Sequence, residues 1–96
     1  MHMPTDYRAL GRYAEAVEQL RYALKQRHYL ATTISRLLLN AGGPDLEGSV
    51  VKSLDTAKIE EIAGELAELE QQINTWVRGA NANAMMSGKP MLTKAL

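Results

Sequence analysis

The chain has 96 residues, no cysteine, and eleven basic residues balanced by eleven acidic ones, so its formal net charge at pH 7 is zero. The absence of cysteine excludes a disulfide scaffold, thiolate zinc sites and cysteine nucleophiles, and the neutral charge argues against generic nucleic-acid binding, which rests on phosphate neutralisation. The length predicts one domain with a modest core, and a hydrophobic fraction of 46% without phenylalanine is typical of a helical bundle.

The charge is unevenly placed along the chain. Residues 1–40 carry six basic and three acidic side chains, whereas residues 41–96 carry five and eight. The two halves could attract each other in a hairpin, or the basic half could bind an external anion. Neither a signal peptide nor an apolar run of membrane-spanning length stands out, so we expect a cytoplasmic protein that does not enter a membrane.

The first predicted helix runs from about residue 6 to residue 40, after an N-terminal extension over residues 1–5. Thr5 or Asp6 is expected to cap it, and the stretch NAGGP at 40–44 is expected to end it. Its apolar positions step by three and four, with Arg27 as the polar interruption, which is a heptad a/d pattern. They are Leu10, Tyr13, Val17, Leu20, Leu24, Ala31, Ile34, Leu38 and Ala41.

A second apolar row widens the face of this helix. Ala9, Ala16, Ala23, Leu30 and Leu37 each precede an a position. A face this broad is wider than a two-stranded coiled coil needs and suits a bundle.

Residues 44–54 then connect to a second predicted helix at about 55–79. Leu46, Val50, Val51 and Leu54 could form a short connecting helix. Asp55 is placed to cap the second helix. An unbroken heptad pattern follows, made of Ile59, Ile62, Leu66, Leu69, Ile73, Trp76 and Ala80.

The hairpin domain is predicted over residues 6–80 and a C-terminal tail over 81–96. The tail, rich in Asn, Ala, Ser, Gly and Pro, is expected to be flexible unless it docks on a partner or on the chain. If it docks, its anchors are Met85, Met86, Met91 and Leu92.

The resulting fold prediction is all-α: an antiparallel helical hairpin assembled as a dimeric four-helix bundle. Two helices with so broad a face cannot cover it for each other, and the longer first helix would overhang the second near residues 10–17. A three-helix monomer is the alternative. The residues expected in the core or the dimer interface are Leu20, Leu24, Leu38, Ile62, Leu66, Leu69, Ile73 and Trp76.

No motif predicts catalysis, a metal site or a cofactor. His2 and His28 are far apart and have no second ligand at helical spacing. Glu61, Glu65 and Glu68 share one side of the second helix without the histidine that a carboxylate metal site would add. SGKP at 87–90 lacks the flanking residues of a phosphate-binding loop. We therefore expect a protein that is not an enzyme and that holds no cofactor.

The remaining candidate is a surface on the first helix. Tyr22, Tyr29 and Arg36 fall at heptad position f, opposite the predicted core, and Lys25 lies beside them. Exposed tyrosines next to cations are a favourable composition for binding a partner, although scattered surface tyrosines are also ordinary. Arg27 at a core position requires an acidic partner, for which the candidates are Glu65, Glu68 and Glu70.

The sequence therefore predicts a non-enzymatic protein–protein interaction module that forms homodimers and binds a larger protein as an adaptor, regulator or inhibitor. The alternative is a dimeric regulator that binds RNA or DNA through the basic face of the first helix. That arrangement resembles the Rop type in outline, with two antiparallel helices per chain, and the analogy is one of fold alone.

Overall fold

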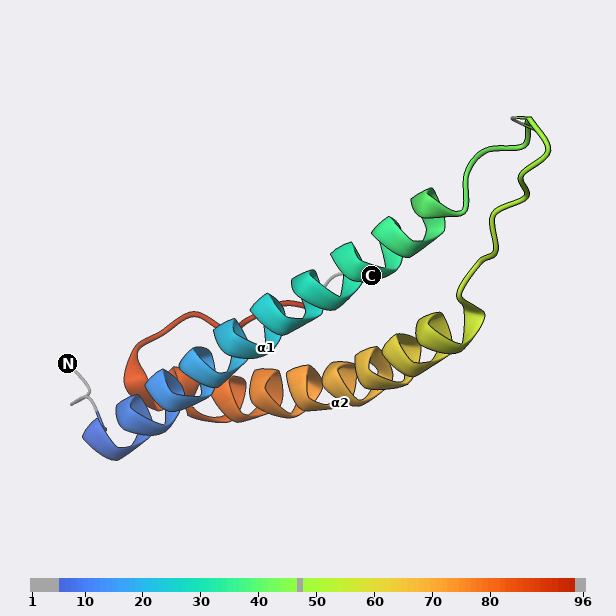
Figure 1. Ribbon diagram of the computed structural model, residues 1–96. Coiled ribbons are helices and arrows are strands. Elements are labelled where there is room, and N and C mark those ends of the chain that lie inside the picture. The colour runs from blue at the N-terminus through green and yellow to red at the C-terminus, as the bar shows by residue number, and fades with distance from the viewer. Residues whose placement is uncertain (1–5, 47, 95–96) are drawn as a thin grey trace.

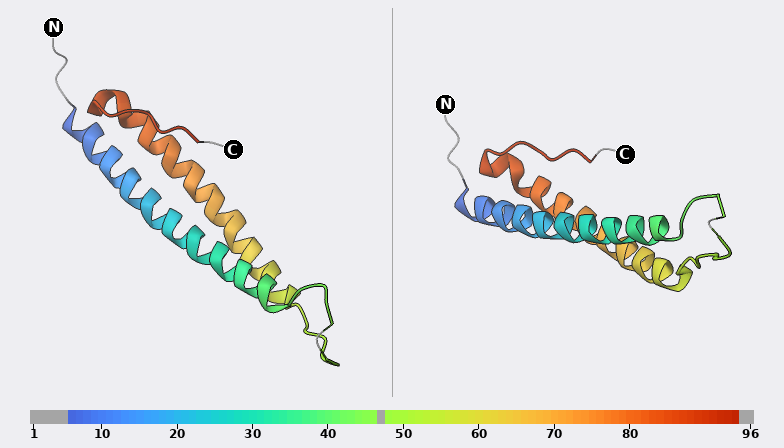
Figure 2. Two further views of the ribbon diagram at one scale, coloured as in Figure 1. Left: turned by 90° about the horizontal axis from the view of Figure 1, so that it is seen from above. Right: turned by 45° about the horizontal axis from the view of Figure 1, so that its top comes forward.

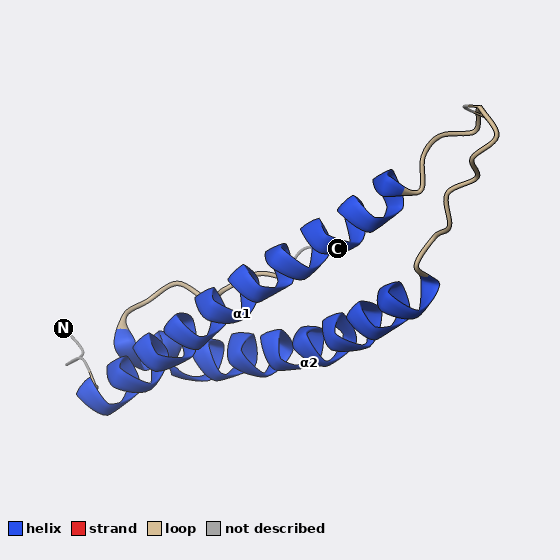
Figure 3. Ribbon diagram, in the orientation of Figure 1, coloured by secondary structure: helices blue, strands red, loops and turns tan. Residues whose placement is uncertain are grey.

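The chain folds into a hairpin of two antiparallel α-helices. The computed structural model describes residues 6–46 and 48–94, in which α1 spans Tyr7–Asn40 and α2 spans Thr56–Ser87 (Figures 1 and 3). No β-strand occurs among these residues, so the prediction of an all-α hairpin is confirmed. In the same ranges, neither helix has the length and apolarity that crossing a membrane requires.

Both helices begin at an aspartate that caps them. The Asp6 carboxylate accepts hydrogen bonds from the backbone N–H groups of Arg8, at 2.9 Å, and Ala9, at 3.2 Å. The Asp55 carboxylate accepts one from the N–H of Lys58, at 3.0 Å. Each bond satisfies an N–H group that has no partner within the helix. Thr5, the other predicted cap for α1, lies outside the described residues.

The two helices meet along small side chains at one end of the hairpin. Ala9, Ala16 and Ala23 of α1 are buried, and Ala80 and Ala84 of α2 have no exposed surface. A Cβ atom placed on Gly79 would lie 3.9 Å from the Cβ of Ala16, which is ordinary contact. Small residues on both helices therefore allow the two backbones to approach closely.

This packing uses only one side of the broad apolar face of α1. The buried residues are Leu20 and the alanines that precede the a positions, whereas Leu24 is 36% exposed and Leu38 is 50% exposed. One helix cannot cover an a/d/g face, and α2 lies over its d and g positions. Leu24 and Leu38 thus lie outside the core of the single chain, together with other a positions. We call Leu10, Val17, Leu24, Ala31 and Leu38 the apolar edge of α1; the first two are half-buried and the others exposed.

The second helix is longer than its sequence predicts. α2 continues eight residues beyond Gly79, so that Asp6 N–H donates to the carbonyl of Met86 at 3.0 Å. The prediction that α1 overhangs α2 near residues 10–17 is therefore wrong, because the end of α2 lies alongside the start of α1. The reason is that the run after Gly79 is rich in alanine, a strong helix former, and that Ala80 and Ala84 are buried against α1. The domain boundary drawn at residue 80 falls inside this helix.

The connection between the helices contains no further helix. Residues 41–46 and 48–55 run as turns and extended chain that loop outward from the end of the hairpin (Figure 1). Among the described residues, the short connecting helix that residues 44–54 could have formed is thus absent. Gly48 has a positive φ of 65°, a backbone conformation that interrupts a right-handed helix. Leu46, Val50 and Val51 are exposed, since no described part of the chain packs over them.

The molecule is a single layer rather than a compact bundle. Its principal extents are 76 × 20 × 17 Å, and its radius of gyration is 20.3 Å, against about 12–13 Å for a compact domain of this length. Its accessible surface is 7880 Å², whereas a compact monomer of the same mass exposes roughly 5,500 Å². Figure 2 shows why: of the described residues outside α1 and α2, only those of the C-terminal segment lie over the pair of helices.

Ala80→Leu tests the close packing of the two helices. Ala80 has no exposed surface, so a larger side chain must push α1 away, and we expect a loss of about 1–3 kcal/mol in the free energy of unfolding. Urea unfolding followed by circular dichroism measures this loss. The matched control is Ala82→Leu, at an exposed position of the same helix. Equal stability of the two variants would contradict the packing described above.

Candidate partner-binding surfaces

Tyr22 and Tyr29 are the most prominent side chains on the middle of α1. They are 62% and 67% exposed, and they follow each other along the helix about 10 Å apart. Gln26, one turn after Tyr22, donates a hydrogen bond from Nε2 to the Tyr22 hydroxyl at 2.9 Å. The first tyrosine is therefore held in place by its own helix.

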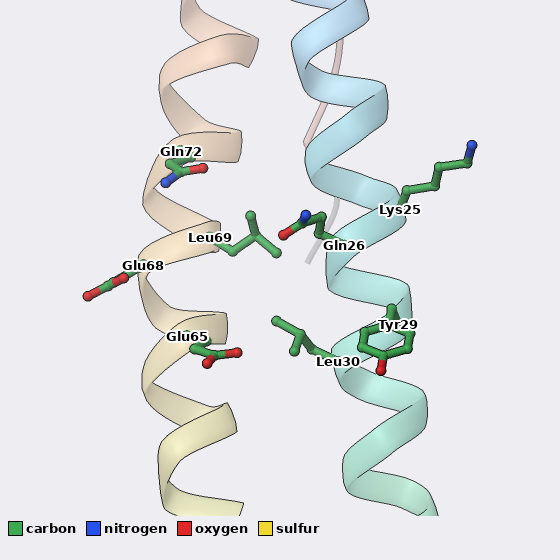
Figure 4. A pocket seen from close by; sticks show the side chains of 8 residues that line it. All are labelled: Lys25, Gln26, Tyr29, Leu30, Glu65, Glu68, Leu69 and Gln72. Carbon is green, nitrogen blue, oxygen red and sulfur yellow. The ribbon is translucent and has the colours of Figure 1, made fainter.

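Two adjoining grooves lie between these tyrosines and α2. One has a volume of about 590 Å³ and is lined by Lys25, Gln26, Tyr29, Leu30, Glu65, Glu68, Leu69 and Gln72 (Figure 4). The other, of about 580 Å³, is lined by Gln19, Tyr22, Ala23, Gln26, Glu68, Leu69, Gln71, Gln72, Thr75 and Trp76. They share four residues, and we call the two together the tyrosine groove.

Heptad position f places Tyr22 and Tyr29 on the side of α1 away from the core. In the structure, however, both border the groove between α1 and α2. Because α1 packs through its d and g positions rather than through a and d, the whole helix is rotated relative to α2. The rotation brings the tyrosine line round to the rim of the groove. Both rings are exposed, as predicted for position f, and they also line the edge of the groove toward α2.

The tyrosine groove has an apolar floor and charged flanks. Leu69 is buried, and Leu30 is half-buried beside it. In Figure 4 both leucines point into the space between the helices, while Lys25 and Glu68 point away on opposite flanks. Glu65 adds a second carboxylate on the α2 side. Arg36, the fourth predicted contact residue, is exposed on α1 but does not line the groove.

The C-terminal segment lies on the other side of the hairpin. In Figure 4 it passes behind α1, and Figure 2 shows it folded back along the hairpin. The turn is made at Gly88, which has a left-handed φ of 70°. Gly88 N–H donates to the carbonyl of Met85 at 3.2 Å, and Lys89 N–H donates to that of Ala84 at 2.9 Å. These two bonds form a Schellman motif, and Pro90 follows it.

Beyond this turn the segment is held by Leu92. The side-chain amide of Asn81 donates to the Leu92 carbonyl at 2.9 Å and accepts from the Leu92 N–H at 2.7 Å. The Leu92 side chain packs against the core cluster of Leu20, Ala23, Leu69 and Ile73. Of the four predicted anchors, Leu92 is the one that packs there, while Met85, Met86 and Met91 are 56–88% exposed.

A small ion cluster ties the same segment to both helices. Arg27 Nη1 lies 2.5 Å from Glu70 Oε1, and Lys94 Nζ lies 3.3 Å from Glu70 Oε2. Lys94 also donates a hydrogen bond to the side chain of Asn74. The prediction that Arg27 pairs with an acid of the second helix is confirmed, with Glu70 as that acid. The hydrogen bond from Arg27, supported by the one from Lys94, lowers the pKa of Glu70 below its ordinary value of 4.5.

The hydrogen bonds that hold the docked segment are individually weak compared with the entropy cost of ordering it. Each hydrogen bond contributes about 0.5–1.5 kcal/mol, and ordering the backbone of one residue costs about 1–2 kcal/mol. The ion pairs are worth little more, since their side chains are 40–43% exposed to screening by water.

The other residues considered for chemistry are not brought together. His28 is exposed, and His2 lies outside the described residues. Within residues 6–46 and 48–94, no three histidine, aspartate or glutamate side chains cluster closely enough to hold a metal ion.

Asn81, Leu92 and Lys94 form a site that the sequence pattern did not predict in detail. A signal for it was present, because Ser87-Gly88-Lys89-Pro90 is the pattern of a helix that ends at a glycine with a proline shortly after it. The pairing of Asn81 with Leu92 has no local signature, since it joins residues eleven positions apart.

Comparisons with protein-family models, with curated proteins and with solved structures found no match for this chain.

The ion cluster predicts a pH dependence of stability. Because the pKa of Glu70 is lowered in the folded chain, its contribution is complete above pH 4.5 and is lost as the pH falls through the lowered value. Glu70→Gln should therefore reduce the free energy of unfolding by roughly 0.2–1 kcal/mol at pH 7 and by less at pH 3. Urea unfolding at both pH values measures the difference. Glu68→Gln, at an exposed position of the same helix, is the control, and an identical pH profile for both variants would refute the role of Glu70.

Proposed function

We propose that this chain is a non-enzymatic protein–protein interaction module that binds the surface of a larger protein in its tyrosine groove. The observation that carries the proposal is the composition of that groove. Tyr22 and Tyr29 stand on its rim, with Trp76 and two leucines along its length. Large aromatic side chains around a partly apolar floor are what protein interfaces use as anchors.

The charge of the groove favours a polypeptide over a nucleic acid. Glu65 and Glu68 line its α2 side, and Lys25 is the cation of its α1 side. Carboxylates at the rim would repel a phosphate backbone, whose binding needs several cations. The RNA- or DNA-binding alternative would have to use the exposed Arg36 and Lys25 away from these acids. An adaptor, a regulator or an inhibitor can each act by binding a partner without carrying out a reaction.

We further propose that two copies of the chain form a four-helix bundle through the apolar edge of α1. The single layer exposes roughly 2,400 Å² more surface than a compact monomer of its mass. A stable interface buries about 800 Å² on each partner, so the excess surface is more than sufficient for a dimer. Leu24 and Leu38 are exposed and would find a cover in such an assembly.

Removal of both tyrosine rings tests the partner site. Tyr22→Ala combined with Tyr29→Ala should leave helical content by circular dichroism unchanged, because both side chains are exposed. Binding to a partner identified by affinity purification and mass spectrometry should fall by at least about tenfold, as for hot-spot residues. The control is Tyr7→Ala, whose side chain is 82% exposed and lies outside the groove.

The salt dependence of the same binding separates the two functions. A protein partner should keep most of its affinity between low and moderate salt, whereas a nucleic acid should lose affinity steeply. Unchanged affinity of the double tyrosine variant would refute the role of the groove. Steep loss with salt, reduced by Lys25→Ala, would establish the nucleic-acid alternative instead.

The dimer is tested by the mass of the chain in solution. The double variant Leu24→Lys with Leu38→Lys should be a monomer, because the two substitutions place two cations on the apolar edge. Light scattering measures the mass. Leu39→Lys is the control, since Leu39 is 79% exposed and not part of that edge. A monomeric unmodified chain, or a dimer that survives both substitutions, would contradict the proposed assembly.

A further inference from the structure

The C-terminal segment lies against the hairpin in the manner of a bound peptide. We call the surface that it covers its groove; this surface is formed by Glu70, Asn74, Asn81 and the core cluster. It is an extended stretch, and Asn81 pairs with both backbone groups of one residue, Leu92. An amide side chain that pairs with an N–H and a C=O of the same residue recognises the main chain and not the identity of that residue. Such a contact serves any extended polypeptide placed there.

The side chains of the segment alternate between the protein and water. Leu92 packs against the core cluster to which both helices contribute, whereas its neighbour Met91 is 66% exposed and Thr93 is exposed. Two residues after Leu92, Lys94 again turns toward the hairpin and contacts Glu70 and Asn74. Side chains two apart lie on the same side of an extended chain, so the groove has one apolar and one cationic position.

Charge complementarity defines the second position. The groups that face Lys94 are the carboxylate of Glu70 and the side-chain oxygen of Asn74, and Glu70 is shared with Arg27. A lysine ammonium can donate three hydrogen bonds and so matches two oxygen acceptors at once. An acidic residue at this position would instead place two carboxylates together.

The chain's own segment lies outside both helices and is held by a few side-chain bonds and by the packing of Leu92. It begins at Gly88, outside α2, and its side-chain hydrogen bonds and ion pair involve three residues of that helix. The groups that bind its backbone and its lysine, Asn81, Glu70 and Asn74, do not line the tyrosine groove. A ligand could therefore replace the segment while the rest of the structure stays intact.

We infer that the groove under residues 88–94 is a binding site for an extended segment of a partner polypeptide, with an apolar residue two positions before a lysine. The chain's own C-terminal segment fills the site until such a partner segment displaces it. Asn81 aligns the partner backbone, the core cluster receives the apolar side chain, and Glu70 with Asn74 binds the lysine.

The test uses a fluorescein-labelled synthetic peptide of residues 88–94 and the full-length chain. Leu92→Ser with Lys94→Ser weakens the chain's own segment and leaves the groove intact. This double variant should bind the peptide about tenfold or more tightly than the unmodified chain, because the site is no longer occupied. Adding Asn81→Ala should reverse that gain. Asn83→Ala, which removes an amide bonded to a carbonyl of its own helix, should not.

The chemistry of the ligand is tested with two further peptides. One carries serine in place of its leucine, and the other carries leucine and lysine at the same spacing in a background of glycine and serine. The first should bind at least about tenfold more weakly than the parent, and the second should still bind. Equal affinity of the unmodified chain and the double variant for the parent peptide, or affinity that does not depend on the leucine, would overturn the inference.

The oligomeric state and the folding of the double variant are measured alongside its binding. If light scattering shows that Leu92→Ser with Lys94→Ser abolishes dimers of the chain, the groove belongs to a second copy and the inference is wrong. If circular dichroism shows that the double variant is not folded, the unmodified chain is titrated with unlabelled peptide. The NMR signal of the Asn81 side-chain amide should then shift as the segment is displaced, and no shift at millimolar peptide would refute the site.

Discussion

The close contact between alanine-rich stretches of α1 and α2 is the constraint on which the rest of this structure depends. Ala16 lies against Gly79, and Ala80 and Ala84 are fully covered. Because these residues are small, α2 packs closely on the d and g positions of α1. The same close packing continues to the end of α2, which lies alongside the start of α1. This packing decides which side chains of α1 are buried and which remain exposed.

Rotation of α1 about this contact gives the hairpin two different faces. On one face, Tyr22 and Tyr29 stand at the rim of a groove with an apolar floor. The other is partly covered by residues 88–94, and Arg27, Glu70 and Lys94 join both helices and that segment. A two-helix layer has little interior, so most of its side chains lie on its faces.

Local rules predicted the parts of the structure that depend on neighbouring residues. Heptad spacing predicted both helices, and Asp6 and Asp55 cap them as expected. The charge of Arg27 at a core position required an acid, and Glu70 supplies it. The end of α2 was placed too early because asparagine and glycine suggested a tail. Burial of Ala80 and Ala84 outweighs those weak local preferences, and burial is a tertiary quantity.

The sequence by itself determined two amphipathic helices, their caps and a supply of exposed aromatic and charged side chains, because these follow from spacing and residue type. Only the tertiary structure decided which part of the broad face of α1 is covered, and hence where the tyrosines point. It also decided that Asn81 meets Leu92 and that Lys94 meets Glu70. Such contacts depend on how the chain folds back at Gly88, and no periodicity encodes a pairing between residues eleven or twenty-four positions apart.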